Sequence, residues 1–328
     1  MASDQIEQFY LSGTVPTIRS TESRADIEAA FPEFEQQISS WGFLAFEVPG
    51  VGKQVSEMYG LFREACSSTC PSIETFSYDR IPQWLAGGNH GFFPYGSEIP
   101  RLSGGIPDPK EFLHVSGAML ENLPPGSGDL LEAFPALAAS ARTTFKIGFE
   151  IAGTLAEFFR SRISSEAPDL GLSRRSTSLR IVRYRDTSQR EVLAHEHSGI
   201  QMLGIQLPPS DGGLQYVLND GTWVEPVLAS TDVLLCNVGR MLSKASGNRL
   251  RPSTHRVHRS ASQGYERYSC VLFVHPDHAL AQWEVDDSGN CQLNLGHTWG
   301  DFVRERVSGL GLVTKSSPGP PELTYIGA

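Results

Sequence analysis

Three histidines in the second half of the chain could hold a metal ion together. His195 and His197 stand two positions apart in a run that predicts a strand, so their side chains would leave the same face and converge on one ion. His255 lies in another short strand-like run, which antiparallel pairing could bring opposite the first two. Three imidazoles on one side of a metal leave positions open for oxygen and a substrate. The chain has nine histidines, however, and a single histidine is more often structural than a ligand.

A second group of donors follows the histidines in the chain. Arg267 and Ser269 alternate onto one face of a predicted strand, where they offer a guanidinium and a hydroxyl. A guanidinium buried beside a metal needs an anion. A dicarboxylate could bind the metal with one end and pair with Arg267 at the other. The residues themselves therefore suggest a metal site that takes an acidic cosubstrate.

The order of these motifs resembles one family, the plant- and fungal-type 2-oxoglutarate/iron(II) dioxygenases related to isopenicillin N synthase. Its first metal-binding strand usually reads HTDxG, and later landmarks follow in a fixed order. Six stretches match that order: Ala194 to Gly199, Gly213 to Gln215, Gly221 to Trp223, Asn237 to Gly239, Ser253 to Val257, and Arg267 to Ser269. Three earlier stretches resemble its WGFF, GYxPxGxE and DxKE elements: Trp41 to Phe43, Gly91 to Glu98, and Asp108 to Phe112. The resemblance covers roughly Val15 to Pro276.

This resemblance implies a fold, cofactors and site residues. The expected fold is mainly β with α: a double-stranded β-helix, or jelly roll, flanked by N-terminal helices and a long scaffold helix. The expected cofactors are Fe(II), 2-oxoglutarate and O2, with ascorbate as a candidate reductant. Carried over residue by residue, His195, His197 and His255 hold the iron, while Arg267, Ser269 and Tyr184 bind 2-oxoglutarate. The implied reaction is hydroxylation, desaturation or cyclisation of a small, secondary-metabolite-like substrate.

Two positions depart from the family pattern. The second ligand is normally the Asp of HxD, but this chain has His197 there, and Glu196 cannot replace it because the next residue along a strand faces away. A three-histidine iron site, a replaced native carboxylate and an impaired metal site are the three interpretations, and we favour the first. Small residues that open a chloride site in related halogenases are absent at this position. The other departure is Val182, where the family often has an Asn beside the cosubstrate.

The substrate pocket is the least specified part of the site. Phe93 and Tyr95 in an aromatic loop, and Phe273 after Arg267, are candidate wall residues for a modest apolar or aromatic metabolite. Two rival functions stay open: an iron oxidase of the same fold that needs no 2-oxoglutarate, and a non-catalytic jelly-roll binding protein whose metal site has changed.

Hydrophobic periodicity places these motifs on elements. Apolar residues three or four apart predict helices over 27–41, 51–65 and 130–163, with a strand over 42–48 between the first two. Short β-type runs follow after Ser176, over 179–184, 192–197, 214–218, 233–237, 254–257 and 268–274. Residues 71–109 show no period and predict an ordered loop, and 316–321 predict a loosely held tail. We expect an N-terminal region (1–120), scaffold helices (121–175), the oxygenase core (176–280) and a C-terminal extension (281–328), joined in one structural unit.

Composition limits the partners. The net charge of -10 and the lack of a Lys or Arg run argue against nucleic acid, and no stretch of about 18 apolar residues predicts a membrane span. Five cysteines without a CxxC spacing suggest reduced thiols. The N-terminus lacks the apolar core of a signal peptide. We therefore expect a cytoplasmic enzyme that acts on a small molecule, while the oligomeric state stays open.

Overall fold

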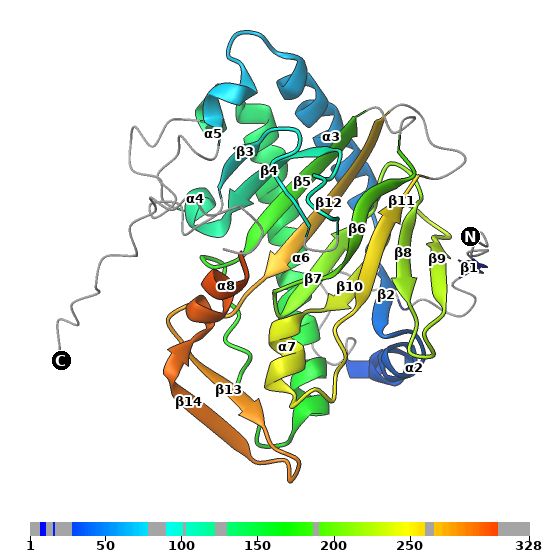
Figure 1. Ribbon diagram of the computed structural model, residues 1–328, viewed down its shortest axis with the longest axis vertical. Helices are drawn as coiled ribbons and strands as arrows, with labels where there is room; N and C mark the ends of the chain where they lie inside the picture. The colour runs from blue at the N-terminus through cyan, green and yellow to red at the C-terminus, as the bar shows by residue number, and fades with distance from the viewer. Residues whose placement is uncertain are drawn as a thin grey trace, which may run out of the picture.

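The computed structural model describes residues 7–10, 16, 28–77, 90–100, 103–121, 130–185, 190–259 and 266–307. The predicted tail over 316–321 lies outside these ranges. Strands and helices alternate through the first half, and strands dominate the second (Figure 1).

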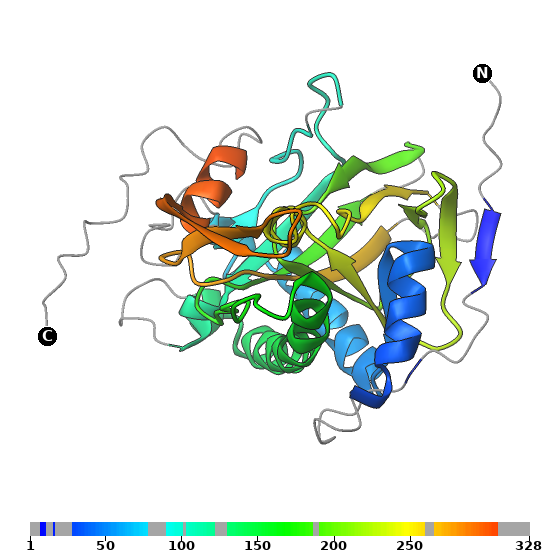
Figure 2. The ribbon, with the colours of Figure 1, turned by 90° about the horizontal axis from the view of Figure 1, so that it is seen from below.

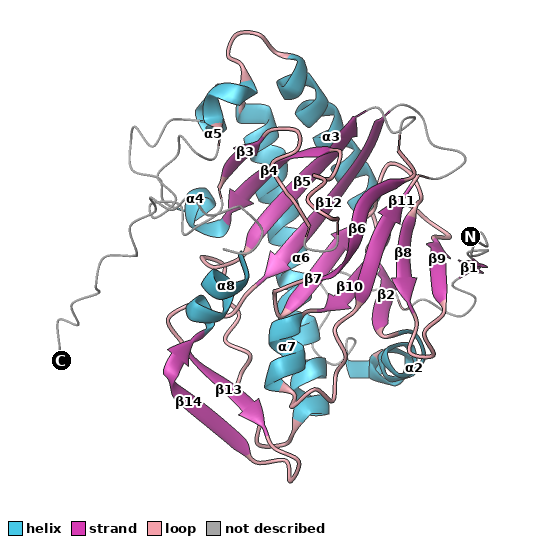
Figure 3. Ribbon diagram, in the orientation of Figure 1, coloured by secondary structure: helices cyan, strands magenta, loops and turns pink. Residues whose placement is uncertain are grey.

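Two β-sheets form the centre of the molecule. The seven-stranded sheet has the order β2-β10-β7-β12-β5-β4-β3, and the five-stranded sheet has the order β1-β9-β8-β11-β6. Each pairing between neighbours is antiparallel except β1 with β9. A separate hairpin, β13-β14, projects from one end (Figure 3). The strands are β1 (Glu7–Tyr10), β2 (Phe43–Glu47), β3 (Gly91–Phe93), β4 (Lys110–Ser116), β5 (Ser178–Arg185), β6 (Val192–Ser198), β7 (Leu203–Leu207), β8 (Leu214–Val217), β9 (Trp223–Val227), β10 (Val233–Val238), β11 (Thr254–His258), β12 (Glu266–Val274), β13 (Ala281–Val285) and β14 (Cys291–Thr298).

Helices cover the outer face of the seven-stranded sheet. The long helix α6 lies beside α3 and packs across β5, β7 and β12 (Figure 2). None of the described helices is long and apolar enough to span a membrane. The helical elements are α2 (Phe31–Trp41), α3 (Val51–Ser67), the 3-10 turn η1 (Ile73–Phe76), α4 (Gly117–Glu121), α5 (Leu130–Ala133), α6 (Pro135–Ile163), α7 (Arg240–Ala245) and α8 (Trp299–Val307).

The two faces of the seven-stranded sheet have different roles. Tyr268, Cys270 and Leu272 of β12 are buried in the main hydrophobic core, which also contains the inner faces of α3 and α6. Because side chains alternate along a strand, Arg267 and Phe273 point to the opposite face, toward the five-stranded sheet. This alternation places the candidate site between the two sheets.

The architecture confirms the predicted jelly-roll class, mostly antiparallel β-sheet with several helices. The helix α2 contains Pro32, which lies in its first turn, where a missing N–H costs nothing. The helix predicted over 130–163 is interrupted before Pro135, which begins α6. The supposed loop over 71–109 contains η1 and β3. All five cysteines are unpaired, as expected.

Candidate active site

Two of the three predicted metal ligands face each other across neighbouring strands. His197 of β6 is the register partner of His255 of β11, and their ring centroids lie 4.4 Å apart. The Nδ1 atom of His197 lies 2.7 Å from the carbonyl oxygen of His195, and Nδ1 of His255 lies 3.0 Å from that of Ser253. A carbonyl can only accept, so each Nδ1 carries the proton and each Nε2 keeps its lone pair. No hydrogen bond engages either Nε2 within the described ranges. This donor set fits a divalent transition metal.

The surroundings keep these two rings neutral. His197 is exposed on the cavity wall, where desolvation by the surrounding protein atoms lowers its pKa to about 4 and the positive charge of Lys110 adds to the shift. Burial also lowers the pKa of His255 to about 3, with His197 as the next contribution. Both imidazoles are therefore unprotonated near neutral pH, which is the form that binds a metal.

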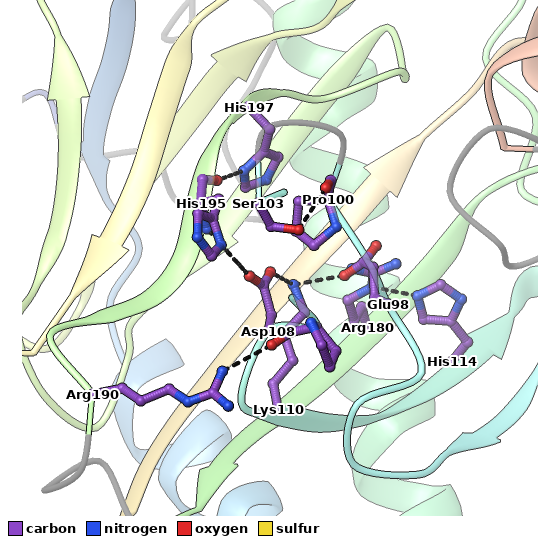
Figure 4. Close-up of polar contacts among 11 residues, drawn as sticks. Glu98, Pro100, Ser103, Asp108, Lys110, His114, Arg180, Arg190, His195 and His197 are labelled. Atoms are coloured by element: carbon purple, nitrogen blue, oxygen red, sulfur yellow. Dashed lines mark hydrogen bonds and ion pairs between the residues drawn. The ribbon is translucent and has the colours of Figure 1, made fainter. Parts of the chain in front are cut away.

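A β-bulge changes the position of the third histidine. His197 pairs with His255 and Ala194 pairs with Val257, so two residues of β6 face one of β11. His195 is one of those two residues, and bulges re-aim side chains. Its ring is turned toward Asp108, with Nδ1 2.8 Å from Oδ1 (Figure 4). No cluster of three or more His, Cys, Asp or Glu side chains that could hold a metal exists among the residues described. The role of His195 as a ligand stays a prediction.

Asp108 joins His195 to a buried network of charges. The Lys110 ammonium lies 2.6 Å from Glu98 and 2.8 Å from Asp108, and Arg180 lies 3.2 Å from Glu98 (Figure 4). Burial alone would raise the pKa of Glu98, but Arg180 and Lys110 outweigh it and hold that pKa well below its usual range. Burial alone would lower the pKa of Lys110, but the two carboxylates raise it. Glu98 and Lys110 are therefore both ionised near neutral pH.

Arg267 is a buried arginine, and one nitrogen of its guanidinium group has no hydrogen-bond partner among the described residues. The residue is 1% exposed, and its Nε donates to the carbonyl oxygen of Gly212 at 2.9 Å. Its Nη1 is buried and has no hydrogen-bond partner within the described residues. An unpaired buried cation is costly, so this position fits the carboxylate of an acidic ligand. Tyr184 is its register partner, with the guanidinium carbon 5.4 Å from the ring centroid, and Ser269 follows on the same face.

A cavity of about 360 Å³ lies between the sheets, beside the two facing histidines. His197, His255 and Phe273 line it, together with Lys110 and Arg180. The side chains predicted to bind 2-oxoglutarate are not among its wall residues.

The three residues predicted to bind the substrate have different surroundings in the structure. Phe273 lines the cavity. Phe93 is fully buried and stacks on Phe112 with centroids 4.5 Å apart, as a packing residue does. Tyr95 is 47% exposed and is not a wall residue.

Four polar residues of the site were given no role from sequence: Glu98, Asp108, Lys110 and Arg180. The first three lie in the GYxPxGxE and DxKE stretches that carried the resemblance, so a signal existed. Their functions could not be assigned because their partners are distant in the chain. Asp108 and His195, for example, are 87 positions apart.

Comparison with known proteins agrees with this class of fold. Residues 176–276 match the model of the 2OG-Fe(II) oxygenase superfamily. The matched segment includes all three histidines and Arg267. No curated protein matched the chain.

Solved structures share the fold over nearly the whole chain. One from Shewanella oneidensis, described as an oxygenase, is 20% identical and has a TM-score of 0.65, covering 92% of this chain and 100% of its own. A 2OG-Fe(II) oxygenase family protein from Caulobacter crescentus is 17% identical with a TM-score of 0.64, covering 91% and 99%. A full-length protein of Neurospora crassa, solved in complex with alpha-KG, is 17% identical with a TM-score of 0.62, covering 90% and 96%.

Proposed function

We propose that this chain is an Fe(II)- and 2-oxoglutarate-dependent oxygenase that hydroxylates, desaturates or cyclises a small secondary metabolite. The observation that carries the proposal is Arg267, whose buried Nη1 has no hydrogen-bond partner in the described part of the chain and lies on the sheet face that also forms the site. Related folds support the cosubstrate, since the Neurospora crassa protein is described in complex with alpha-KG and JOX2 in complex with 2OG, Fe and JA.

The proposed metal ligands are the Nε2 atoms of His197 and His255, with His195 as the third. When bound, Fe(II) supplies the activation of O2 that couples oxidative decarboxylation of 2-oxoglutarate to substrate oxidation. The Nδ1 contacts of the three rings fix their orientation, and the surroundings keep His197 and His255 neutral. A site of three imidazoles brings no negative charge to the metal. The dianionic cosubstrate would therefore supply the negative charge that balances the metal ion.

The proposed cosubstrate contacts are Arg267, Ser269 and Tyr184. Arg267 would pair with the carboxylate distal to the metal, and the hydroxyls of the other two would donate to the same group. Burial strengthens this ion pair and excludes water from the reaction. The cavity, at about 360 Å³, is of the size that accepts a small organic molecule.

Succinate formation in the presence of Fe(II), O2 and 2-oxoglutarate tests the proposal. We expect succinate from the wild-type chain, and we expect Arg267→Met to weaken 2-oxoglutarate binding by about tenfold or more, because a buried charge-assisted pair is lost. Arg304→Ala is the matched control, since that exposed arginine pairs with Asp301 and is not a wall residue of the cavity. Oxygen consumption that never yields succinate would favour the oxidase that needs no 2-oxoglutarate.

A further inference from the structure

Arg180 lies in an aromatic clamp on the cavity wall. Its guanidinium carbon is 4.2 Å from the ring centroid of Phe112 and 5.0 Å from that of Phe273. These rings come from β4 and β12, the two strands that flank β5. Stacking on both neighbours fixes the plane of the guanidinium, so little conformational freedom is lost when it binds a ligand.

Only part of this guanidinium is used by the protein. Its Nε donates to His114, and its Nη1 donates to Glu98 at 3.2 Å. No hydrogen bond engages Nη2 within the described ranges, and that atom is not among the buried unsatisfied ones. The side chain is 13% exposed and lines the cavity. The Nη2 donors are therefore accessible, and the cavity is where they can meet a ligand.

The other charges of the cavity wall favour an anionic ligand. Glu98 and Asp108 are both paired with Lys110. Two further guanidinium groups line the cavity, Arg240 of α7 and Arg306 of α8, against one further carboxylate, Glu196. The wall residues carry one more positive than negative charge, and Arg306 is itself 3.8 Å from Glu305. Arg240 is therefore the cation that adds positive potential to the cavity beside Arg180.

We propose that Arg180 anchors the substrate through a carboxylate oxygen that accepts from Nη2, with the apolar part of the substrate against Phe273. This inference rests on the proposed function, because it takes the cavity as the substrate site. It narrows the substrate class to small carboxylic acids that carry a flat or apolar body. A neutral carbonyl group could accept the same hydrogen bond without a charge. Comparing an acid with the amide of the same carbon skeleton distinguishes a carboxylate ligand from a neutral carbonyl ligand.

Three probes with one skeleton test the anchor: phenylacetate, phenylacetamide and 2-phenylethylamine. Binding is measured by ligand-observed NMR on the full chain, first as purified and then with Mn(II) and saturating 2-oxoglutarate. We expect phenylacetate to bind best, phenylacetamide more weakly and the amine not at all. Arg180→Met should weaken phenylacetate binding by about tenfold or more, because a charge-assisted hydrogen bond is lost. Arg240→Ala should weaken the binding of phenylacetate and leave the binding of phenylacetamide unchanged, since only the charged acid responds to the positive potential of the cavity wall.

Two further variants control for misfolding and for a general loss of positive charge. Arg180→Lys retains the ion pair with Glu98 but lacks the Nη2 donors, so it should fold and still lose phenylacetate affinity. Arg304→Ala should change nothing. Binding of 2-oxoglutarate should fall in Arg267→Met and not in Arg180→Met, which separates this inference from the proposed function. The inference is overturned if the amine binds as well as the acid, if acid and amide bind equally, or if the Arg180 variants bind phenylacetate like the wild type.

Discussion

Asp108 places a negative charge next to a predicted metal ligand. The HxD motif would put a carboxylate on the metal, whereas here a buried carboxylate lies 2.8 Å from Nδ1 of His195. A carboxylate in this position fixes the tautomer that presents Nε2 and makes the imidazole a stronger donor. We predict that Asp108→Asn lowers Fe(II) affinity by about 10- to 100-fold, as measured by anaerobic equilibrium dialysis.

The control for this change is Asp287→Asn, on an exposed turn between β13 and β14. It removes the same charge from the chain without touching the site. Equal iron affinity in wild type and Asp108→Asn would show that His195 is not a ligand, or that its carboxylate partner has no influence on the metal.

Residue patterns predicted part of this site. The spacing of His197, His255 and Arg267 was enough to bring them to the space between the sheets, because register and alternation follow from strand geometry. The bulge at His195 was not predictable, since one inserted residue leaves no mark in the hydrophobic pattern. The contact with Asp108 was also missed because it spans distant segments.

At the scale of elements, most strands of the second half were predicted, including the fully buried β10, but β4 and β7 were missed. All seven residues of β4 are buried, although its sequence includes Lys110, Glu111 and His114. Ion pairs of Lys110 with Glu98 and of Glu111 with Arg183 make that burial possible. Because both faces of the strand are buried, its sequence lacks the alternation of polar and apolar residues that predicts a strand. The helix over 130–163 was recognised because its apolar stripe is long, yet its break before Pro135 was not.

The packing of α6 on β12 depends on a small residue. A Cβ added at Gly148 would come within 2.9 Å of Leu272 Cδ2, whereas one added at Gly153 meets nothing within 4 Å. We predict that Gly148→Val destabilises the fold by about 1–3 kcal/mol through overpacking. Gly153→Ala should stabilise it by about 0.5–1 kcal/mol, because alanine favours the helix. Urea unfolding measures both, and a stabilising Gly148→Val would contradict this account of the helix–sheet interface.

For the whole molecule, buried histidines make stability depend on pH. Burial lowers the pKa of His90 and of His255 from 6.5 to about 3. The unfolded chain binds protons at these residues below about pH 6.5, while the native protein does not until about pH 3. The free energy of unfolding should therefore fall as pH decreases below about 6.5, by about 1.4 kcal/mol per pH unit for each histidine.

Denaturant unfolding at about pH 7.5, 6.5 and 5.5, with a chelator present to remove metal, measures this slope. His90→Gln removes one of these groups and should make the pH dependence shallower. A stability that stays constant across this range would mean that these rings accept protons in the folded protein.

Anaerobic addition of Fe(II) and then 2-oxoglutarate to the full chain tests the central claim most directly, that the histidines and Arg267 form an iron and 2-oxoglutarate site. We predict one equivalent of bound iron and a visible absorption band typical of an iron-bound 2-oxo acid. His255→Ala should lose both, because one of the two facing imidazoles is gone. Failure of the wild-type chain to take up iron, or unchanged uptake by His255→Ala, would contradict the account.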